Sequence, residues 1–177
     1  MKIRHAAAAA VVVFIAGAGV GYTAQKQQKT TTQMYHAKAN QDAAKELLAV
    51  AKLQAGKGSW EQIAVGRVYY LGGFKAEGQA IFDAILAGKH EDSDVFRIAR
   101  VYSEAGEWDK AKPLFARYFQ GTDDDGTGYA EVGALYVMRG DRAIGEEMFD
   151  RSVALESNDL WATLHMAGAY LNVRPQE

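Results

Sequence analysis

The chain has 177 residues, about half of them hydrophobic, and a formal net charge of −2 at pH 7. This length suits one domain with a buried core and a short appendage. A chain so close to neutral offers no basic face for nucleic acid, so we expect no nucleic-acid partner. The sequence contains no cysteine, which excludes disulfide bonds and thiolate chemistry and removes the usual ligands of zinc and iron–sulfur sites.

Residues 1–24 have the pattern of an export segment. Lys2 and Arg4 precede an uncharged, mainly apolar stretch at 6–24, which is close to the shortest length that spans a bilayer. We expect a single anchor retained in a bacterial inner membrane, with the remaining chain in the periplasm because the basic residues stay on the cytoplasmic side. The alternative is a signal peptide cleaved after Ala18, which would release a soluble periplasmic protein. A polar linker is predicted at 25–33.

Downstream of the linker, five positions recur together with a period of 33 or 34 residues. The recurring sets are Gly66, Ala99 and Gly133; Tyr69, Tyr102 and Tyr136; Gly73, Gly106 and Gly140; Gly78, Ala111 and Gly145; and Phe82, Phe115 and Phe149. A partial fourth copy follows, with Ala167 and Tyr170 one period further along. Such self-similarity is typical of stacked repeats. The predicted segments are repeats at 59–91, 92–125 and 126–159, and a capping helix at 160–177.

Each repeat is predicted to form a helix, a turn and a second helix. In the second repeat, apolar residues at 95–102 follow the i, i+3, i+4 spacing of an amphipathic helix. Gly106 stands where that helix must end, a place that favours a residue with positive φ. The second helix carries Ala111 and Phe115 on one face. The small residues allow the two helices to approach closely, so the sequence predicts an all-α protein of stacked hairpins.

This pattern of small residue, Tyr, Gly, small residue and Phe resembles the tetratricopeptide repeat family over residues 59–177. Residues 34–58 match in part, with Tyr35 at the first-helix offset and Ala44 and Leu48 at second-helix offsets, which predicts a degenerate repeat with a helix at about 35–55. The resemblance implies a right-handed superhelix, that is, an α-solenoid of stacked helix pairs. It also implies a role in holding other proteins rather than in chemistry.

The turns and the final helix give further expectations. The acidic runs 91–94 and 123–125 fall at equivalent turns between repeats, where carboxylates cap the helix that follows. In the capping helix, Trp161 and Leu164 are expected to cover the apolar face of the last repeat. His165 is expected on the polar face of that helix.

No residues stand out as catalytic or metal-binding. The four histidines are scattered and form no pair at metal-ligand spacing. The acidic run 123–125 lacks the alternating oxygen ligands and the glutamate that a calcium-binding EF-hand requires. No nucleophile is accompanied by a consistent acid–base pair. We therefore expect no enzyme, no metal and no cofactor.

The remaining candidate is a protein-binding surface on the first helices of the repeats. Arg67 and Arg100 occupy equivalent positions, and Tyr70, Phe96 and Arg97 are close to them in the predicted superhelix. Guanidinium groups beside aromatic rings suit an acidic, partly apolar segment of a partner protein. The alternative for both arginines is an ion pair with a nearby acidic residue. The hypothesis for function is a non-enzymatic scaffold of an envelope assembly; the alternative is a self-assembling protein whose groove receives a helix of another copy.

Overall fold

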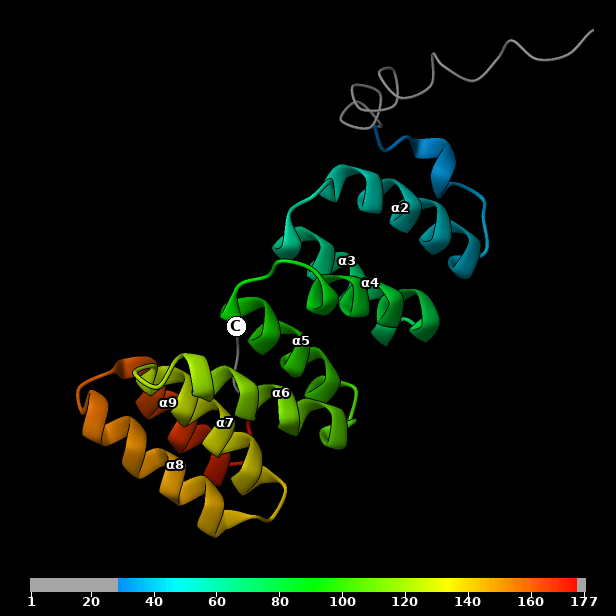
Figure 1. Cartoon of the computed structure of the whole chain (residues 1–177). Coiled ribbons are helices and arrows are strands. Elements are labelled where there is room, and N and C mark those ends of the chain that lie inside the picture. The colour runs from blue at the N-terminus through cyan, green and yellow to red at the C-terminus, as the bar shows by residue number, and fades with distance from the viewer. Residues whose placement is uncertain (1–28, 175–177) are drawn as a thin grey trace, which may run out of the picture. The chain divides into compact units, whose positions relative to one another are not determined.

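The structure is a computed structural model that describes residues 29–174, and within this range the chain is helical and has no strand (Figure 1). The described residues divide into two compact units, with the boundary between Gly88 and Lys89. The elements of the first unit are the short 3₁₀ helix η1 (Thr32–Met34), α2 (Asn40–Ala55), α3 (Ser59–Leu71) and α4 (Lys75–Ala87). Those of the second unit are α5 (Asp92–Glu104), α6 (Trp108–Gly121), α7 (Gly126–Met138), α8 (Arg142–Leu155) and α9 (Leu160–Tyr170). The all-α prediction is confirmed.

The predicted export segment, residues 1–24, lies outside the described residues. None of the helices within 29–174 is long and apolar enough to cross a membrane.

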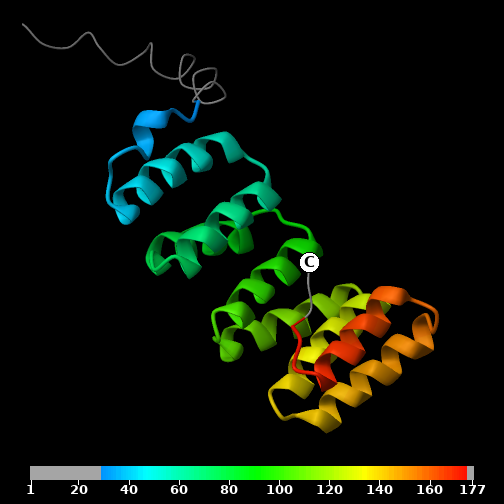
Figure 2. The same ribbon diagram turned by 180° about the vertical axis from the view of Figure 1, so that it is seen from behind.

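The helices pack as antiparallel hairpins within each unit. α3 packs against α4 in the first unit, and α5 against α6 and α7 against α8 in the second (Figure 2). α9 packs beside α7. Helices α3, α5, α7 and α9 begin at residues 59, 92, 126 and 160. Their starts are thus one repeat period apart.

The turn of each hairpin uses the recurring glycine. Gly73, Gly106 and Gly140 have φ of +93°, +79° and +94°, a region in which a side chain would be strained. The residue after each glycine donates its backbone N–H to the carbonyl of the recurring tyrosine: Phe74 to Tyr69 and Glu107 to Tyr102, both at 2.8 Å, and Asp141 to Tyr136 at 3.0 Å. This six-residue closure ends the first helix and sets the direction of the second.

The recurring small residues lie where the two helices of a hairpin come closest. A Cβ atom added to Gly145 would lie 2.6 Å from the backbone oxygen of Gly133, and one added to Gly78 would lie 2.7 Å from that of Gly66. The second repeat has alanine at both positions, Ala99 and Ala111, and both are fully buried. The hairpins of the first and third repeats therefore approach more closely than a β-carbon permits.

Replacing Gly145 by alanine should destabilise the second unit although alanine is the better helix former. The added methyl group would meet the backbone of Gly133 and the side chain of Val137, and overpacking of this kind costs about 1–3 kcal/mol, more than the gain in helix propensity of up to about 1 kcal/mol. Urea unfolding followed by circular dichroism measures the change. Gly126→Ala is the matched control, since its Cβ would make only ordinary contacts. Equal stability of the two variants would contradict close packing at Gly145.

The acidic turns cap the helices that follow them, as predicted. Asp125 is the N-cap of α7 and accepts a hydrogen bond from the Gly128 N–H at 2.9 Å. Glu91, the N-cap of α5, forms a reciprocal capping box with Asp94. One period after Asp125, Asp159 caps α9 by accepting from the Ala162 N–H at 2.7 Å. Each carboxylate satisfies N–H groups that the helix itself leaves unpaired.

Part of the amino-terminal prediction is corrected. The helix expected at about 35–55 begins at Asn40 and continues to Ala55, and Ala44 and Leu48 lie on it as second-helix residues. Tyr35 lies in a turn after η1 and is exposed, so the degenerate repeat contributes one helix of a pair. That helix, α2, packs against α3.

The expected covering role of Trp161 and Leu164 is wrong. Their side chains are 65% and 50% exposed. The face of α9 that meets the third repeat carries smaller residues instead: Ala169 joins Ala134 and Phe149 in a buried cluster, with Met166 packed against it. Small side chains bring α9 close to α7, and the large apolar ones are left on its outer side.

Candidate protein-binding cleft

A cleft of about 770 Å³ lies within the second unit, between α5, α7, α9 and the segment after α9. It is lined by Arg100, Thr127, Trp161, Leu164, His165, Ala167, Gly168, Leu171, Val173 and Arg174. The residues from α5 and α7 are half-buried, whereas Trp161, Leu164, Leu171 and Val173 are exposed. The cleft therefore has a polar inner wall and an open apolar wall, a combination typical of binding sites.

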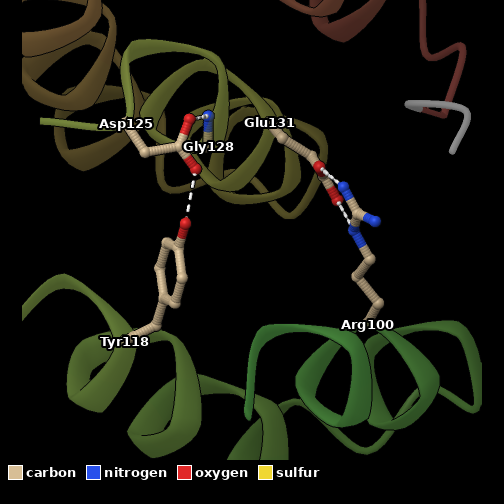
Figure 3. A network of polar contacts seen from close by, with 5 residues as sticks. All are labelled: Arg100, Tyr118, Asp125, Gly128 and Glu131. Atoms are coloured by element: carbon tan, nitrogen blue, oxygen red, sulfur yellow. Dashed lines mark hydrogen bonds and ion pairs between the residues drawn. The ribbon is translucent and has the colours of Figure 1, made fainter. Parts of the chain in front are cut away.

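The inner wall is organised by an ion pair between two hairpins. Arg100 of α5 donates from Nε to Oε1 of Glu131 on α7 at 2.6 Å, and its Nη2 donates to the second carboxylate oxygen (Figure 3). The side chain of Glu131 is only 6% exposed and that of Arg100 26%. A two-point contact of this kind fixes orientation as well as charge, so it sets the position of α5 against α7 at the cleft.

A second polar contact joins the same hairpins. The Tyr118 hydroxyl of α6 donates to Oδ2 of Asp125 at 2.7 Å, while Oδ1 of Asp125 accepts from the Gly128 N–H (Figure 3). Burial, and then the hydrogen bond and charge of Asp125, raise the pKa of Tyr118 well above its usual value. The hydroxyl thus stays protonated and able to donate near neutral pH.

His165 lies on the buried side of α9, which corrects its predicted place on the polar face. Burial lowers the pKa of His165, the charge of Arg100 lowers it further, and Glu131 and Asp159 oppose the shift. Because burial disfavours the charged imidazole, the ring is neutral at pH 7. The inner wall of the cleft therefore presents one neutral ring beside a paired arginine.

Two further arginines add positive charge near the open side. Arg174 lines the cleft, and burial followed by the charge of this neighbour lowers the pKa of Arg139. The guanidinium carbon of Arg139 lies 4.5 Å from the centroid of the Trp108 ring. Since the charge of Arg100 is balanced by Glu131, Arg174 supplies the positive charge of the cleft lining, and Arg139 is near enough to feel that charge.

The predicted groove residues occupy different environments. Arg67 and Tyr70 belong to the first unit and Phe96, Arg97 and Arg100 to the second. Tyr70 is 2% exposed and packs on Phe82, with ring centroids 5.7 Å apart. In the second unit the structure brings Arg100 and Phe96 together, with the guanidinium carbon 4.8 Å from the ring centroid.

Phe96 is 6% exposed, and its ring packs against Phe115 and Tyr118, so it supports the hairpin from inside. Arg97 donates to the Ser93 hydroxyl at 3.0 Å, and its Nη1 lies 3.7 Å from Oδ1 of Asp94 on the same helix. The alternative considered for Arg100, a pair with a nearby acidic residue, is confirmed.

The apolar wall of the cleft was not among the predicted site residues. Its signal was present in the sequence, because Leu160, Leu164, Ala167 and Leu171 follow the i, i+4, i+7, i+11 spacing of one helix face. That spacing alone does not say whether the face is covered. Glu131 was missed for another reason: its arginine partner lies 31 positions away in the sequence.

Comparison with known proteins leaves the family open. No protein-family model matches the chain, and no curated protein is significantly similar to it. Within residues 29–174, no group of three or more histidine, aspartate or glutamate side chains is placed to hold a metal ion.

Replacing Glu131 by leucine should destabilise the second unit, because it leaves Arg100 partly buried without its carboxylate partner. Loss of one member of a buried pair costs about 3–5 kcal/mol, and the partial exposure of Arg100 reduces this to about 2 kcal/mol. Chemical denaturation measures this loss in the free energy of unfolding. The double variant Arg100→Met/Glu131→Leu should recover most of the loss. Glu146→Leu, which removes an exposed pair with Arg142 and an exposed hydrogen bond from Tyr170, should cost much less than Glu131→Leu. Equal effects of Glu131→Leu and Glu146→Leu would contradict a structural role for the pair.

Acidification should destabilise the second unit through His165. Because the folded-state pKa of His165 is lowered, the unfolded chain binds the proton more readily, so the stabilisation is complete above about pH 6.5 and is lost progressively as the pH falls below it. The free energy of unfolding should therefore drop between about pH 7.5 and pH 5.5. His165→Gln should flatten this dependence. An unchanged slope in that variant would show that other groups cause it.

Proposed function

We propose that the chain is a tetratricopeptide-like protein whose hairpins stack as a right-handed superhelix. Three features support this proposal. The helices begin at the period of 33 or 34 residues, the recurring glycines close the hairpins with positive φ, and the recurring small residues lie between paired helices. Each hairpin leaves a face that only a neighbouring hairpin can cover.

In this proposal the protein is a non-enzymatic scaffold that holds a segment of another protein in the cleft of the second unit. The cleft supports this role: it joins an exposed apolar wall on α9 to the positive charge of Arg174, with Arg139 nearby. An acidic, partly apolar helix or extended segment has the complementary chemistry. The exposed Trp161 is of a residue type that often dominates binding energy.

The proposed cellular location rests on the amino-terminal sequence. The basic start and uncharged stretch of residues 1–24 favour export and a retained inner-membrane anchor, with the repeats in the periplasm as part of an envelope assembly. A soluble periplasmic form, after cleavage of the segment, is the alternative. Mass spectrometry of the mature amino terminus separates the two.

Self-assembly is the second candidate function. The observation that favours it is the line of exposed apolar residues along α9, which no helix within residues 29–174 covers. An apolar face of this kind suits another copy of the chain as well as a different protein.

The scaffold proposal is tested by reversing the charge at Arg174, an exposed residue of the cleft. Arg174→Glu should reduce recovery of crosslinked partner protein from native membranes about tenfold or more, if the contact with an acidic segment is desolvated. Lys112→Glu, an exposed position on α6 outside the cleft, is the matched control. Arg174 is preferable to Arg100, whose removal would strand Glu131. Wild-type recovery with a correctly folded Arg174→Glu protein would exclude the cleft as the partner site.

A further inference from the structure

The inner wall of the cleft contains a histidine, His165, whose ring forms no hydrogen bond within residues 29–174. The other polar residues of that wall are already occupied. Arg100 pairs with Glu131, and the Thr127 hydroxyl donates to Oδ2 of Asp159 at 2.8 Å. His165 is nevertheless only 8% exposed. The wall therefore holds a buried ring whose hydrogen-bonding groups are not used by the described chain.

The ring of His165 is open to the cleft. Within residues 29–174, Ser152 Oγ is the only buried side-chain nitrogen or oxygen atom that lacks both a partner and contact with solvent. The nitrogens of His165 also lack a partner, so they keep contact with solvent, and the residue lines the cleft. Covering a polar group without a hydrogen bond is costly. A molecule that fills the cleft must therefore offer a hydrogen bond to this ring.

The sequence explains why His165 has no partner. Arg100 reaches from α5 to Glu131 on α7. One repeat period later, the equivalent positions on α7 and α9 hold Ala134 and His165. Ala134 is fully buried and has no atom beyond its β-carbon, so it cannot make the corresponding bridge.

The charges around His165 define what can bind to it. The ring is acted on by Arg100 of α5, by Glu131 of α7 and by Asp159 at the start of α9. Because Arg100 and Glu131 balance each other, Asp159 leaves the surroundings negative, and a carboxylate placed here would meet a like charge. A neutral imidazole has one donor and one acceptor nitrogen, and a hydroxyl or an amide can serve either. A neutral polar side chain is therefore the best match.

Arg174 is a second and separate polar contact point of the cleft. Asn172 has a φ of +57°, and the Val173 N–H donates to the Gly168 carbonyl at 2.8 Å, so the chain folds back after α9 and holds Arg174 at the cleft. No carboxylate within residues 29–174 pairs with Arg174. Its charge is not among those that act on His165. A bound segment can therefore satisfy the two residues with two different side chains.

We propose that the segment bound in the cleft carries two polar residues with separate roles. A serine, threonine, asparagine or glutamine hydrogen-bonds to His165, and an acidic residue pairs with Arg174. Apolar residues of the segment contact Leu164 and Leu171 on the apolar wall. This inference rests on the scaffold proposal and adds the chemistry by which the cleft selects its partner, with His165 as a specificity-determining residue.

Synthetic peptides test this chemistry on the full chain. Each peptide consists of alanine and leucine with one serine and one glutamate, and the panel varies the number of residues between these two. Binding is measured by the fluorescence anisotropy of a dye attached to the peptide. In the peptide that binds most tightly, replacing serine by alanine should weaken binding about tenfold, because it leaves the ring of His165 covered but unpaired. Replacing serine by aspartate should weaken it as well, because of the charge of Asp159.

Variants of the chain assign the effect to one residue. His165→Leu should abolish the difference between the serine and alanine peptides, whereas His165→Gln, which keeps a neutral hydrogen-bonding group, should retain most of it. Arg174→Gln is the matched control, since it should weaken both peptides by the same factor. Circular dichroism confirms that each variant folds.

Four results would overturn this inference. They are no binding by any peptide of the panel, equal binding of the serine and alanine peptides, a serine preference that survives His165→Leu, and an aspartate peptide that binds as tightly as the serine peptide.

The scaffold proposal is measured separately, by recovery of a partner from native membranes. A recovered partner that depends on Arg174, together with equal binding of the serine and alanine peptides, would leave the scaffold proposal standing and overturn the role of His165. A serine preference that depends on His165, together with unchanged recovery in Arg174→Glu, would support the role of His165 and exclude the cleft as the site of the scaffold.

Discussion

The structure depends on close contact between paired helices at their small residues, and in the first and third repeats this contact is between the two backbones. Gly78 lies against the carbonyl of Gly66, and Gly145 against that of Gly133. Because the two helix backbones are in contact at these glycines, they exclude water without any side chain between them. The aromatic residue one turn further along the second helix, Phe82 or Phe149, is buried and fills the adjacent space. A larger residue would separate the helices and expose the aromatic ring. The small residue and the phenylalanine that follows it in the second helix are thus both needed for the same close packing of the two helices.

The hairpins of the second unit are joined by different chemistry. Long side chains bridge them: Phe119 stacks on Tyr129 with centroids 4.1 Å apart, Trp108 meets Tyr136 at 4.9 Å, and Arg100 pairs with Glu131. Aromatic side chains bury a large area each, but their contacts tolerate small shifts. The buried ion pair does not, because a displaced carboxylate would lose its two-point contact with Arg100. Register between the hairpins, and with it the shape of the cleft, depends on this polar contact.

Local features of the fold could be predicted from the sequence. Gly106 marks a helix end because positive φ is a property of one residue, and Asp125 marks a helix start because its carboxylate reaches its own backbone. The inner wall of the cleft could not be predicted in this way. Glu131 and His165 are buried by contacts between different hairpins, and neither residue differs in local sequence from one on a solvated face. The error at Trp161 and Leu164 has the same origin, because periodicity identifies an apolar face without saying what covers it.

The composition of α9 differs from that expected of a helix that closes a row of repeats. A helix that closes a row of repeats needs large apolar residues toward its neighbour and polar ones toward water. In α9 the order is reversed: Ala162 and Ala169 are buried, and Trp161 and Leu164 face outward. The small inner residues let α9 settle against α7 as the first helix of another hairpin does, and the outer residues match those that a second helix would cover. α9 therefore packs on α7 through small residues, and its large apolar residues remain on the exposed side.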